Sequence, residues 1–317
     1  MNSRLAFGIA FAFALAACAS NAQPNELQGS RYELFVLGTA QDGGLPHFGC
    51  DRACCAEARR TGRVLHPTSL GVVDHETGKL LLIEATPKIE EQVALLHRLA
   101  GTEARGRTPV DAVLLTHAHM GHYLGLAWFG REVASATAVA TYCTERMAAF
   151  LRGHGPWKQL VELGQLELHA FPPGDVLTPL PGLTVLTFSV PHRDEFSDTV
   201  AYVLIGPRRR VLFVPDVDAW ERAPELLAQL MIDVDVAFID GTFYDGRELP
   251  DRNLAEIRHP LMTDTMERLQ GMAASKNGLV RFLHCNHTNP VLHDEALRRA
   301  LEQRGFRLAE TGERVGL

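Results

Sequence analysis

The sequence has little positive charge. It contains 31 Lys and Arg residues and 38 Asp and Glu residues, which gives a formal net charge of −7. Nucleic-acid binding draws its affinity from clustered basic side chains that displace counterions from phosphates. The one dense basic run, residues 208–210, is only three arginines long and is typical of a solvated turn between strands. We therefore expect no nucleic-acid partner.

The chain also lacks internal repeats and low-complexity segments, which excludes a repeat array. Long hydrophobic runs are missing too, since the uncharged apolar stretch at residues 5–17 is too short to cross a bilayer comfortably. With 317 residues, 46% hydrophobic and 22% charged, the composition is that of a globular protein with a substantial core.

The first thirty residues have the features of an export signal. Arg4 precedes the apolar stretch, which ends in Leu15-Ala16-Ala17-Cys18, a pattern similar to the bacterial lipobox. We expect a lipoprotein signal peptide at 1–17, acylation of Cys18, a polar tether over 18–30 and a folded domain over 31–317. The alternative is an ordinary signal peptide cut near residues 17–20. Ala19 is not the Asp that resembles an inner-membrane retention signal. The expected location is therefore the periplasmic face of the outer membrane, with the lipid as the only membrane contact.

Cysteines are few, and their number is odd beyond Cys18, so they cannot all pair in disulfides. Three of the remaining five lie together in CDRACC, at residues 50–55. That clustering favours a metal clip over a disulfide framework.

The hydrophobic patterning predicts one continuous α/β domain. Strands are expected near 31–40, 110–117, 183–190, 199–206, 210–216, 234–243 and 279–285, a two-stranded hairpin over 70–85, and helices near 87–100, 121–130, 144–153, 221–231, 260–274 and 292–304. Two strand-rich halves, each with flanking helices, suggest a four-layer αββα sandwich. The polar candidate residues follow strand ends, where binding residues usually collect.

Three histidines stand within six residues in VLLTHAHMGHYLGL, at positions 117, 119 and 122. His117 and His119 point the same way on an extended segment, and His122 falls in the first turn of the helix that follows. Neutral imidazole is a good zinc ligand, and a strand-to-helix corner fixes the angles that tetrahedral coordination requires. The spacing predicts a metal site.

THAHMGH resembles the His-x-His-x-Asp-His signature of the metallo-β-lactamase superfamily, and later landmarks follow in the same order. SVPHRDEFSDTVAYVL resembles the segment with a third histidine ligand, here His192. VLFVPDVD resembles the strand end whose aspartate bridges two metals, here Asp216, and VRFLHCNHTNP resembles the terminal motif, here His284. The resemblance implies the metallo-β-lactamase fold and one or two zinc ions in the active site.

LGTAQDGGLPHFGCDRACC, FIDGTF and HCNHTNP further resemble the branch of the pyrroloquinoline quinone biosynthesis B protein and of a phosphodiesterase for cyclic ribose phosphates. In that branch a cysteine cluster and a histidine hold a structural zinc. The resemblance carries this role to Cys50, Cys54, Cys55 and His287. The family pattern is Cys-x-Cys-x-x-Cys, so Cys54 departs from it, and Cys285 or His47 is an alternative fourth ligand. A Cys50–Cys54 or Cys50–Cys55 disulfide is the other interpretation.

Gly121 occupies the place where the superfamily has an aspartate ligand of the second metal. The second site would then retain His122, Asp216 and His284, with one negative charge fewer. That loss would weaken the site and favour an anionic substrate group.

His259, in IRHPLMTD, resembles a histidine of the branch that protonates the leaving group. Asp240, in DGT, is expected to orient His259 or a ligand histidine, or else to be a simple turn aspartate. Asp218 is expected to cap a helix.

We expect a zinc-dependent hydrolase that attacks a phosphodiester or another small anionic ester through a metal-bound hydroxide, with lactones or lactams as a second substrate class. The alternatives are an oxidoreductase or carrier of a quinone precursor, and a degenerate protein that binds metal or ligand without turnover. The oligomeric state is left open between a monomer and a homodimer.

Overall fold

The computed structural model describes residues 29–249, 253, 256 and 258–317. The expected signal peptide, Cys18 and most of the tether lie outside the described residues. Within them, no helix is both long enough and apolar enough to span a membrane.

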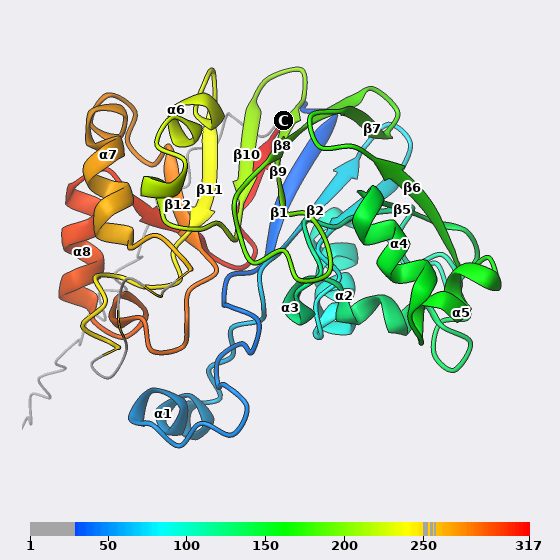
Figure 1. Ribbon diagram of the computed structural model, residues 1–317, viewed down its shortest axis with the longest axis horizontal. Helices are drawn as coiled ribbons and strands as arrows, with labels where there is room; N and C mark the ends of the chain where they lie inside the picture. Colours follow the sequence, from blue (N-terminus) through cyan, green and yellow to red (C-terminus); the bar gives the residue numbers. More distant parts are fainter. Residues whose placement is uncertain (1–28, 250–252, 254–255, 257) are drawn as a thin grey trace, which may run out of the picture.

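Two seven-stranded mixed sheets form the centre of the molecule (Figure 1). The first sheet has the order β14-β1-β2-β3-β4-β5-β6, and its strands are β1 (Tyr32–Gly38), β2 (Ser69–Asp74), β3 (Lys79–Ile83), β4 (Ala112–Leu114), β5 (Val139–Thr144), β6 (Leu166–Phe171) and β14 (Arg314–Gly316). The second has the order β13-β12-β11-β10-β9-β8-β7, and its strands are β7 (Val176–Leu180), β8 (Leu183–Ser189), β9 (Val200–Ile205), β10 (Arg210–Val214), β11 (Val236–Asp240), β12 (Val280–Leu283) and β13 (Arg307–Leu308).

Helices cover the outer face of each sheet. Against the first sheet lie α2 (Ile89–Ala100), α4 (Glu145–Gly153) and α5 (Trp157–Glu162); against the second lie α6 (Leu226–Leu230), α7 (Met262–Ser275) and α8 (Glu295–Gln303). One apolar core fills the space between the sheets and one lies under each helix layer. The four-layer sandwich expected from the patterning is therefore confirmed.

Local chemistry explains where several elements begin and end. The Thr144 side chain accepts a hydrogen bond from the Met147 amide at the start of α4, and Asp294 caps α8 in the same way through two amides. The helix α2 ends at Gly101, whose φ of 67° is the left-handed conformation that favours glycine.

Two expected helices are shorter than the sequence suggested. The helix predicted at 221–231 is a 3-10 turn, Trp220–Arg222, followed by the short α6, because Pro224 interrupts the run. The helix predicted at 121–130 is α3 (Met120–Tyr123) followed by a 3-10 segment, Leu124–Phe129. There Gly125 passes so close to the β3–α2 connection that a Cβ atom would lie 2.1 Å from the Thr86 carbonyl oxygen.

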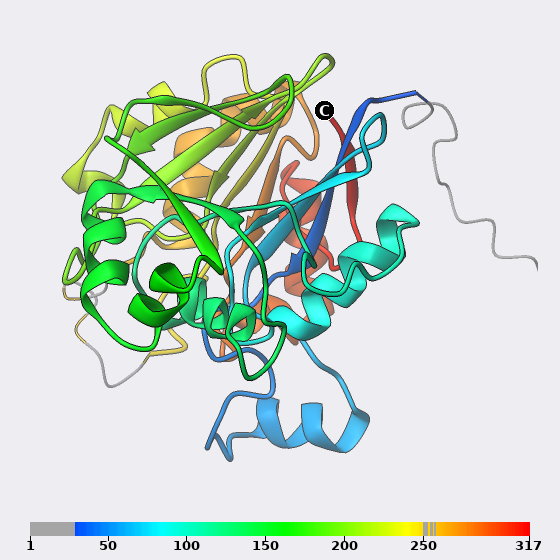
Figure 2. The ribbon, with the colours of Figure 1, turned by 90° about the vertical axis from the view of Figure 1, so that its right-hand side faces the viewer.

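One helix, α1 (Ala53–Thr61), lies outside the sandwich and below both sheets in Figures 1 and 2. No helix was expected in this cysteine-rich stretch. Residues on either side of α1 connect it to β1 and β2.

Candidate metal centre

The candidate ligands come from loops that follow strand ends in both sheets. His117, His119 and His122 follow β4, and His192 follows β8. Asp216, Asp240 and His284 come from the ends of β10, β11 and β12, which are parallel neighbours. Carboxyl ends of parallel strands meet at one edge of a sheet, so the topology collects these side chains in one place.

The first group consists of three histidines arranged around Asp216. The Asp216 carboxylate lies 3.3 Å from Nε2 of His117 and 3.1 Å from Nε2 of His192. Nδ1 of His119 is 3.8 Å from Asp216 and 2.9 Å from Nε2 of His117. All four ligand atoms lie within 4.8 Å of one another, as the resemblance implied for a first metal.

The second group contains an unexpected carboxylate. His122 and His284 lie with Nε2 at 3.7 Å and 3.9 Å from Asp216. Oδ1 of Asp42, from the loop after β1, lies 3.3 Å from Nε2 of His122 and 3.4 Å from Nε2 of His284. A carboxylate therefore stands beside the second group of candidate ligands, although Gly121 supplies none.

Buried atoms without hydrogen-bond partners test whether the residues fit a metal. Among the described residues, Nε2 of His122, His192 and His284 and Oδ1 of Asp42 and Asp216 are buried with no hydrogen-bond partner. Such orphaned groups are costly and need an explanation. Their separations of 3.1–3.9 Å suit ligands about 2.0–2.1 Å from a tetrahedral zinc ion, which lie about 3.3 Å apart. The donor set therefore fits a divalent metal.

Other polar groups lie behind the histidines and orient their rings. Thr116 contacts Nδ1 of His117 at 2.8 Å, and Thr242 contacts Nδ1 of His284 at 3.0 Å. Glu84, fully buried with a φ of 70°, holds Oε2 3.6 Å from Nδ1 of His122. Outer groups of this kind fix the tautomer and raise the basicity of ligand histidines.

Asp218 also lies behind one of the candidate histidines, His192. Its Oδ1 lies 3.5 Å from Nδ1 of His192, and its Oδ2 accepts hydrogen bonds from Arg222 and Arg258 at 3.0 Å. The expectation that Asp218 caps a helix was wrong, because the 3-10 turn Trp220–Arg222 begins after Ala219 without a side-chain cap.

Electrostatics in the centre keep the carboxylates ionised. Burial raises the pKa of Asp216, but His259, His284 and His192 outweigh it and hold the pKa well below the ordinary value. For Asp42, burial again raises the pKa, and the neighbouring imidazoles of His122 and His284 outweigh it and hold the pKa well below its ordinary value.

The imidazoles respond in opposite directions. Burial, together with the nearby charge of His122, holds the pKa of His117 well below its ordinary value. Burial also lowers the pKa of His122, but Glu84 and Asp42 outweigh it and raise the pKa well above the ordinary value. The carboxylates of Glu84 and Asp42 therefore favour the charged form of His122.

His259 lies beside the bridging carboxylate and is held by a second one. Its Nδ1 is 2.9 Å from Oδ2 of Asp240 and 3.2 Å from Oδ1 of Asp216. Asp240, fully buried, also accepts hydrogen bonds from the amides of Val217 and Thr242. Burial lowers the pKa of His259, but Asp240 and Asp216 raise it to about 9.

The cysteine cluster forms a separate group. Cys50, Cys54, Cys55 and His287 offer ligand atoms within 4.8 Å of one another. Cys54 and Cys55 both join because they lie in the first turn of α1, where neighbouring side chains diverge less than on an extended chain. The five cysteines of the described residues are free thiols.

The two alternative ligands of that cluster are placed differently. Cys285 is buried in the core under α7 and α8. The ring of His47 stacks on His287 with centroids 4.4 Å apart. Burial, and after it the charge of His47, lowers the pKa of His287 to about 4. A neutral imidazole is the form that binds metal.

An apolar groove of about 1100 Å³ opens beside the centre and includes Asp42, His119 and Gly121 in its wall. Phe48, Met120 and Phe196 line it with exposed fractions of 94%, 66% and 57%. Lys88, Arg193 and Glu195 supply its charged groups. Exposed apolar side chains gathered at a groove mark a binding surface.

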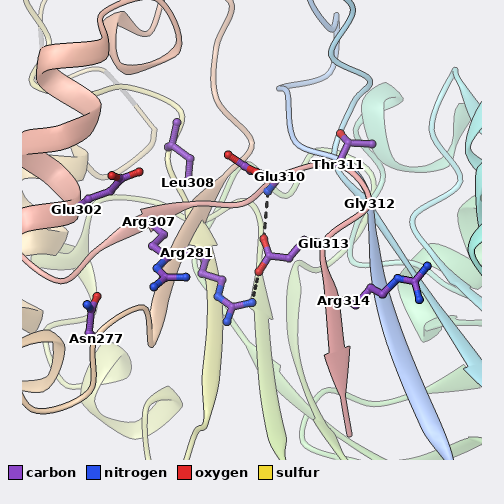
Figure 3. A pocket seen from close by; sticks show the side chains of 10 residues that line it. All are labelled: Asn277, Arg281, Glu302, Arg307, Leu308, Glu310, Thr311, Gly312, Glu313 and Arg314. Carbon is purple, nitrogen blue, oxygen red and sulfur yellow. Dashed lines mark hydrogen bonds and ion pairs between the residues drawn. The ribbon is translucent and has the colours of Figure 1, made fainter. Parts of the chain in front are cut away.

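A different cavity, of about 840 Å³, is shown in Figure 3 and contains none of the candidate ligands. Its lining brings together three arginines and three glutamates: Arg281, Arg307, Arg314, Glu302, Glu310 and Glu313. Arg281 of β12 pairs there with Glu313, just before β14, and so ties the second sheet to the first. The balanced charges give this cavity no preference for a charged ligand.

The site residues that the sequence analysis missed are Asp42, Glu84 and Asp218. Asp42 stands in the Gly-rich turn of LGTAQDGGLPHFGCDRACC, a stretch from which only the cysteines were taken as ligands, and Glu84 directly follows a buried strand. The one available signal was an acidic residue immediately after a strand, as in the 81–84 run LLIE.

Comparison with known proteins gives one family and two sets of similar chains. The model of the β-lactamase superfamily domain matches residues 79–284. Coenzyme PQQ synthesis protein B of Methylorubrum extorquens (strain AM1) is 24% identical over 298 residues, covering 87% of this chain and 97% of the relative. The protein of the same name from Rhizobium meliloti (strain 1021) is 27% identical over 321 residues, with coverage of 91% and 99%.

Among solved structures, Zn²⁺-bound PqqB from Methylobacterium extorquens superposes with a TM-score of 0.76 at 23% identity, covering 90% of this chain and all of the other. A diphosphatase from the PhnP family superposes with a TM-score of 0.63 at 22% identity, with coverage of 90% and 96%. These likenesses support the same fold that the sheet order indicates.

Proposed function

The chain belongs to the β-lactamase superfamily, and from that membership we propose that it is a metal-dependent hydrolase of small anionic esters, with zinc as its metal. The observation that carries the proposal is the set of orphaned imidazole and carboxylate atoms around Asp216. His117, His119 and His192 would hold one ion, and His122 and His284 would hold a second, with Asp216 between them. A metal held there would polarise the scissile group and lower the pKa of a bound water to about 7.

His259 is the residue we propose as general acid. Because Nδ1 of His259 is hydrogen-bonded to Asp240 at 2.9 Å, Nε2 of His259 is left to contact the substrate. A protonated His259 can give the Nε2 proton to the departing oxygen, while the Nδ1 proton stays on the ring and is donated to Asp240 in the hydrogen bond. Asp240 acts through His259 and is a positioning residue.

The groove supports a substrate with two unlike parts. Its inner end meets the candidate ligands at His119 and Asp42, where the reacting ester or phosphodiester would lie. Its apolar wall would hold a hydrophobic substituent, and the positive charge of the proposed metal ions would attract an anionic group. We therefore propose an anionic ester or phosphodiester with an apolar substituent.

The test is a hydrolysis screen of zinc-loaded protein. Bis(p-nitrophenyl) phosphate and alkyl p-nitrophenyl phosphodiesters of increasing alkyl length are compared, and turnover is expected to rise with the size of the apolar group. His117→Ala should abolish turnover, and His259→Ala should reduce kcat by about 10²–10⁴-fold. Equal turnover in wild type and both variants would refute the proposal.

A second candidate function follows from the relatives, which are named for coenzyme PQQ synthesis. We infer from them the alternative of an oxidoreductase or carrier that holds a quinone precursor in the same apolar groove. Oxygen uptake with a tyrosine-derived substrate, in the absence of ester hydrolysis, would favour the oxidoreductase. Tight binding of such a compound without any product would instead favour a carrier or another non-catalytic binding protein.

A further inference from the structure

The side chain of Asp42 lies in the space beside Gly121 that a side chain at position 121 would occupy. A Cβ atom built on Gly121 would lie 2.1 Å from Oδ1, 2.4 Å from Cγ and 2.7 Å from Cβ of Asp42. Real Cβ atoms essentially never come this close to another heavy atom. The carboxylate of residue 42 therefore occupies the volume that any side chain at position 121 would need.

The inner oxygen of Asp42 is directed at the second group of candidate ligands. Oδ1 lies 3.3 Å from Nε2 of His122 and 3.4 Å from Nε2 of His284. All three atoms are buried and have no hydrogen-bond partner within the described part of the chain. The rest of the Asp42 side chain remains partly exposed, at 39%, because it faces the groove.

The backbone holds Asp42 in register with His284. The Gln41 amide donates to the Cys285 carbonyl at 2.9 Å, and the Cys285 amide donates to the Thr39 carbonyl at 3.0 Å. Ala40 forms an isolated parallel bridge with Cys285. The loop that carries Asp42 is thus hydrogen-bonded to the residue next to a candidate ligand, which fixes the position of the carboxylate.

We propose that Asp42 is the carboxylate ligand of the second metal, supplied from the β1 loop in place of the residue that Gly121 lacks. The inference rests on the proposed two-metal centre. Together with His122, His284 and the shared Asp216, Asp42 completes four protein ligands, the number that zinc commonly takes. Glycine at 121 is then required by space, because a larger residue would displace this ligand.

The first experiment compares wild type with Asp42→Asn, which keeps the shape of the side chain and removes its charge. Asp175→Asn, at an exposed turn, is the matched control. After loading with excess zinc and desalting, mass spectrometry should find about one zinc fewer per chain in Asp42→Asn. Competition with a chromogenic chelator should show the weaker site losing affinity by about 100-fold or more.

A second pair of variants separates ligand loss from misfolding. Gly121→Asp alone places two side chains in one volume and should lower both Tm and the occupancy of the second site. The exchange Asp42→Gly with Gly121→Asp moves the carboxylate to the other backbone and should restore the second zinc. Cobalt(II) loading adds a readout independent of activity, because the visible spectrum of the second ion should disappear in Asp42→Asn and return in the exchange variant.

Wild-type zinc content and affinity in folded Asp42→Asn would overturn the inference. If that variant does not fold, an exchange variant that folds without a second zinc would overturn it instead. A wild type that binds both ions but hydrolyses no ester would refute the proposed function alone and leave the ligand assignment standing.

Discussion

A single buried carboxylate, Asp74, holds the start of β1 against the β2–β3 turn. It accepts hydrogen bonds from Arg31 at 3.1 Å and 3.0 Å, from the Thr77 hydroxyl at 2.8 Å and from the Glu76 amide at 3.0 Å. Burial raises the pKa of Asp74, but these hydrogen bonds outweigh it and lower the pKa below its ordinary value.

We predict that the contribution of Asp74 to stability disappears in acid. Because the pKa is lower in the folded than in the unfolded chain, the stabilisation is complete above about pH 4 and is lost as the pH falls through the folded value. Asp74→Asn should lower the free energy of unfolding by about 1–3 kcal/mol at pH 7, and the difference from wild type should shrink toward pH 3. Urea denaturation at each pH measures it. A difference that is independent of pH would contradict the assignment.

The candidate ligands that the sequence indicated are those with short, regular spacing. His117, His119 and His122 follow one strand at fixed intervals, so their meeting in space follows from local geometry. Asp42 lies next to His122 in space, although the two residues are 80 positions apart in the chain. No local pattern records such a contact, and the same holds for Glu84 behind His122.

Among the secondary-structure elements, long periodic segments were predictable and the cysteine-rich stretch was not. The helices α2, α4, α7 and α8 and the strands of both sheet centres lie near the predicted ranges. The nine-residue α1 has only two buried residues, Cys55 and Ala58, so its apolar pattern is too weak to indicate a helix. The cysteines at the start of α1 lie close to His287, which is far away in the sequence, so no local pattern indicates where this helix lies.

We predict that α1 owes its position to a metal held by Cys50, Cys54, Cys55 and His287. The apolar cluster under α1 contains only three buried residues, so packing alone supplies little stability. Removing the ion with a chelator, or replacing Cys54 by Ser, should cost about one zinc per chain and should increase proteolysis within residues 47–65. Cys143→Ala, in the core under α4, should keep the zinc content of wild type. Unchanged zinc content in Cys54→Ser would contradict the prediction.

For the whole molecule, the expected lipid anchor at Cys18 remains a prediction, since it lies outside the described residues. We propose that cells expressing the full chain attach fatty acid to Cys18 and place the protein in the outer membrane. A clickable fatty acid should label wild type and leave Cys18→Ser unlabelled, and fractionation should then find the variant outside the membrane pellet. Labelling of Cys18→Ser would contradict the proposal.

The hydrogen bonds between residues 39–41 and Cys285 also have a consequence for the order of events during synthesis. The second group of ligands draws on positions 42, 122, 216 and 284, so it cannot form until nearly nine-tenths of the chain has left the ribosome. Capture of the proposed second metal would therefore be a late event in the life of each molecule. Any product of premature termination before residue 284 would lack the closing histidine, and its failure to retain the ion would distinguish it from a finished chain.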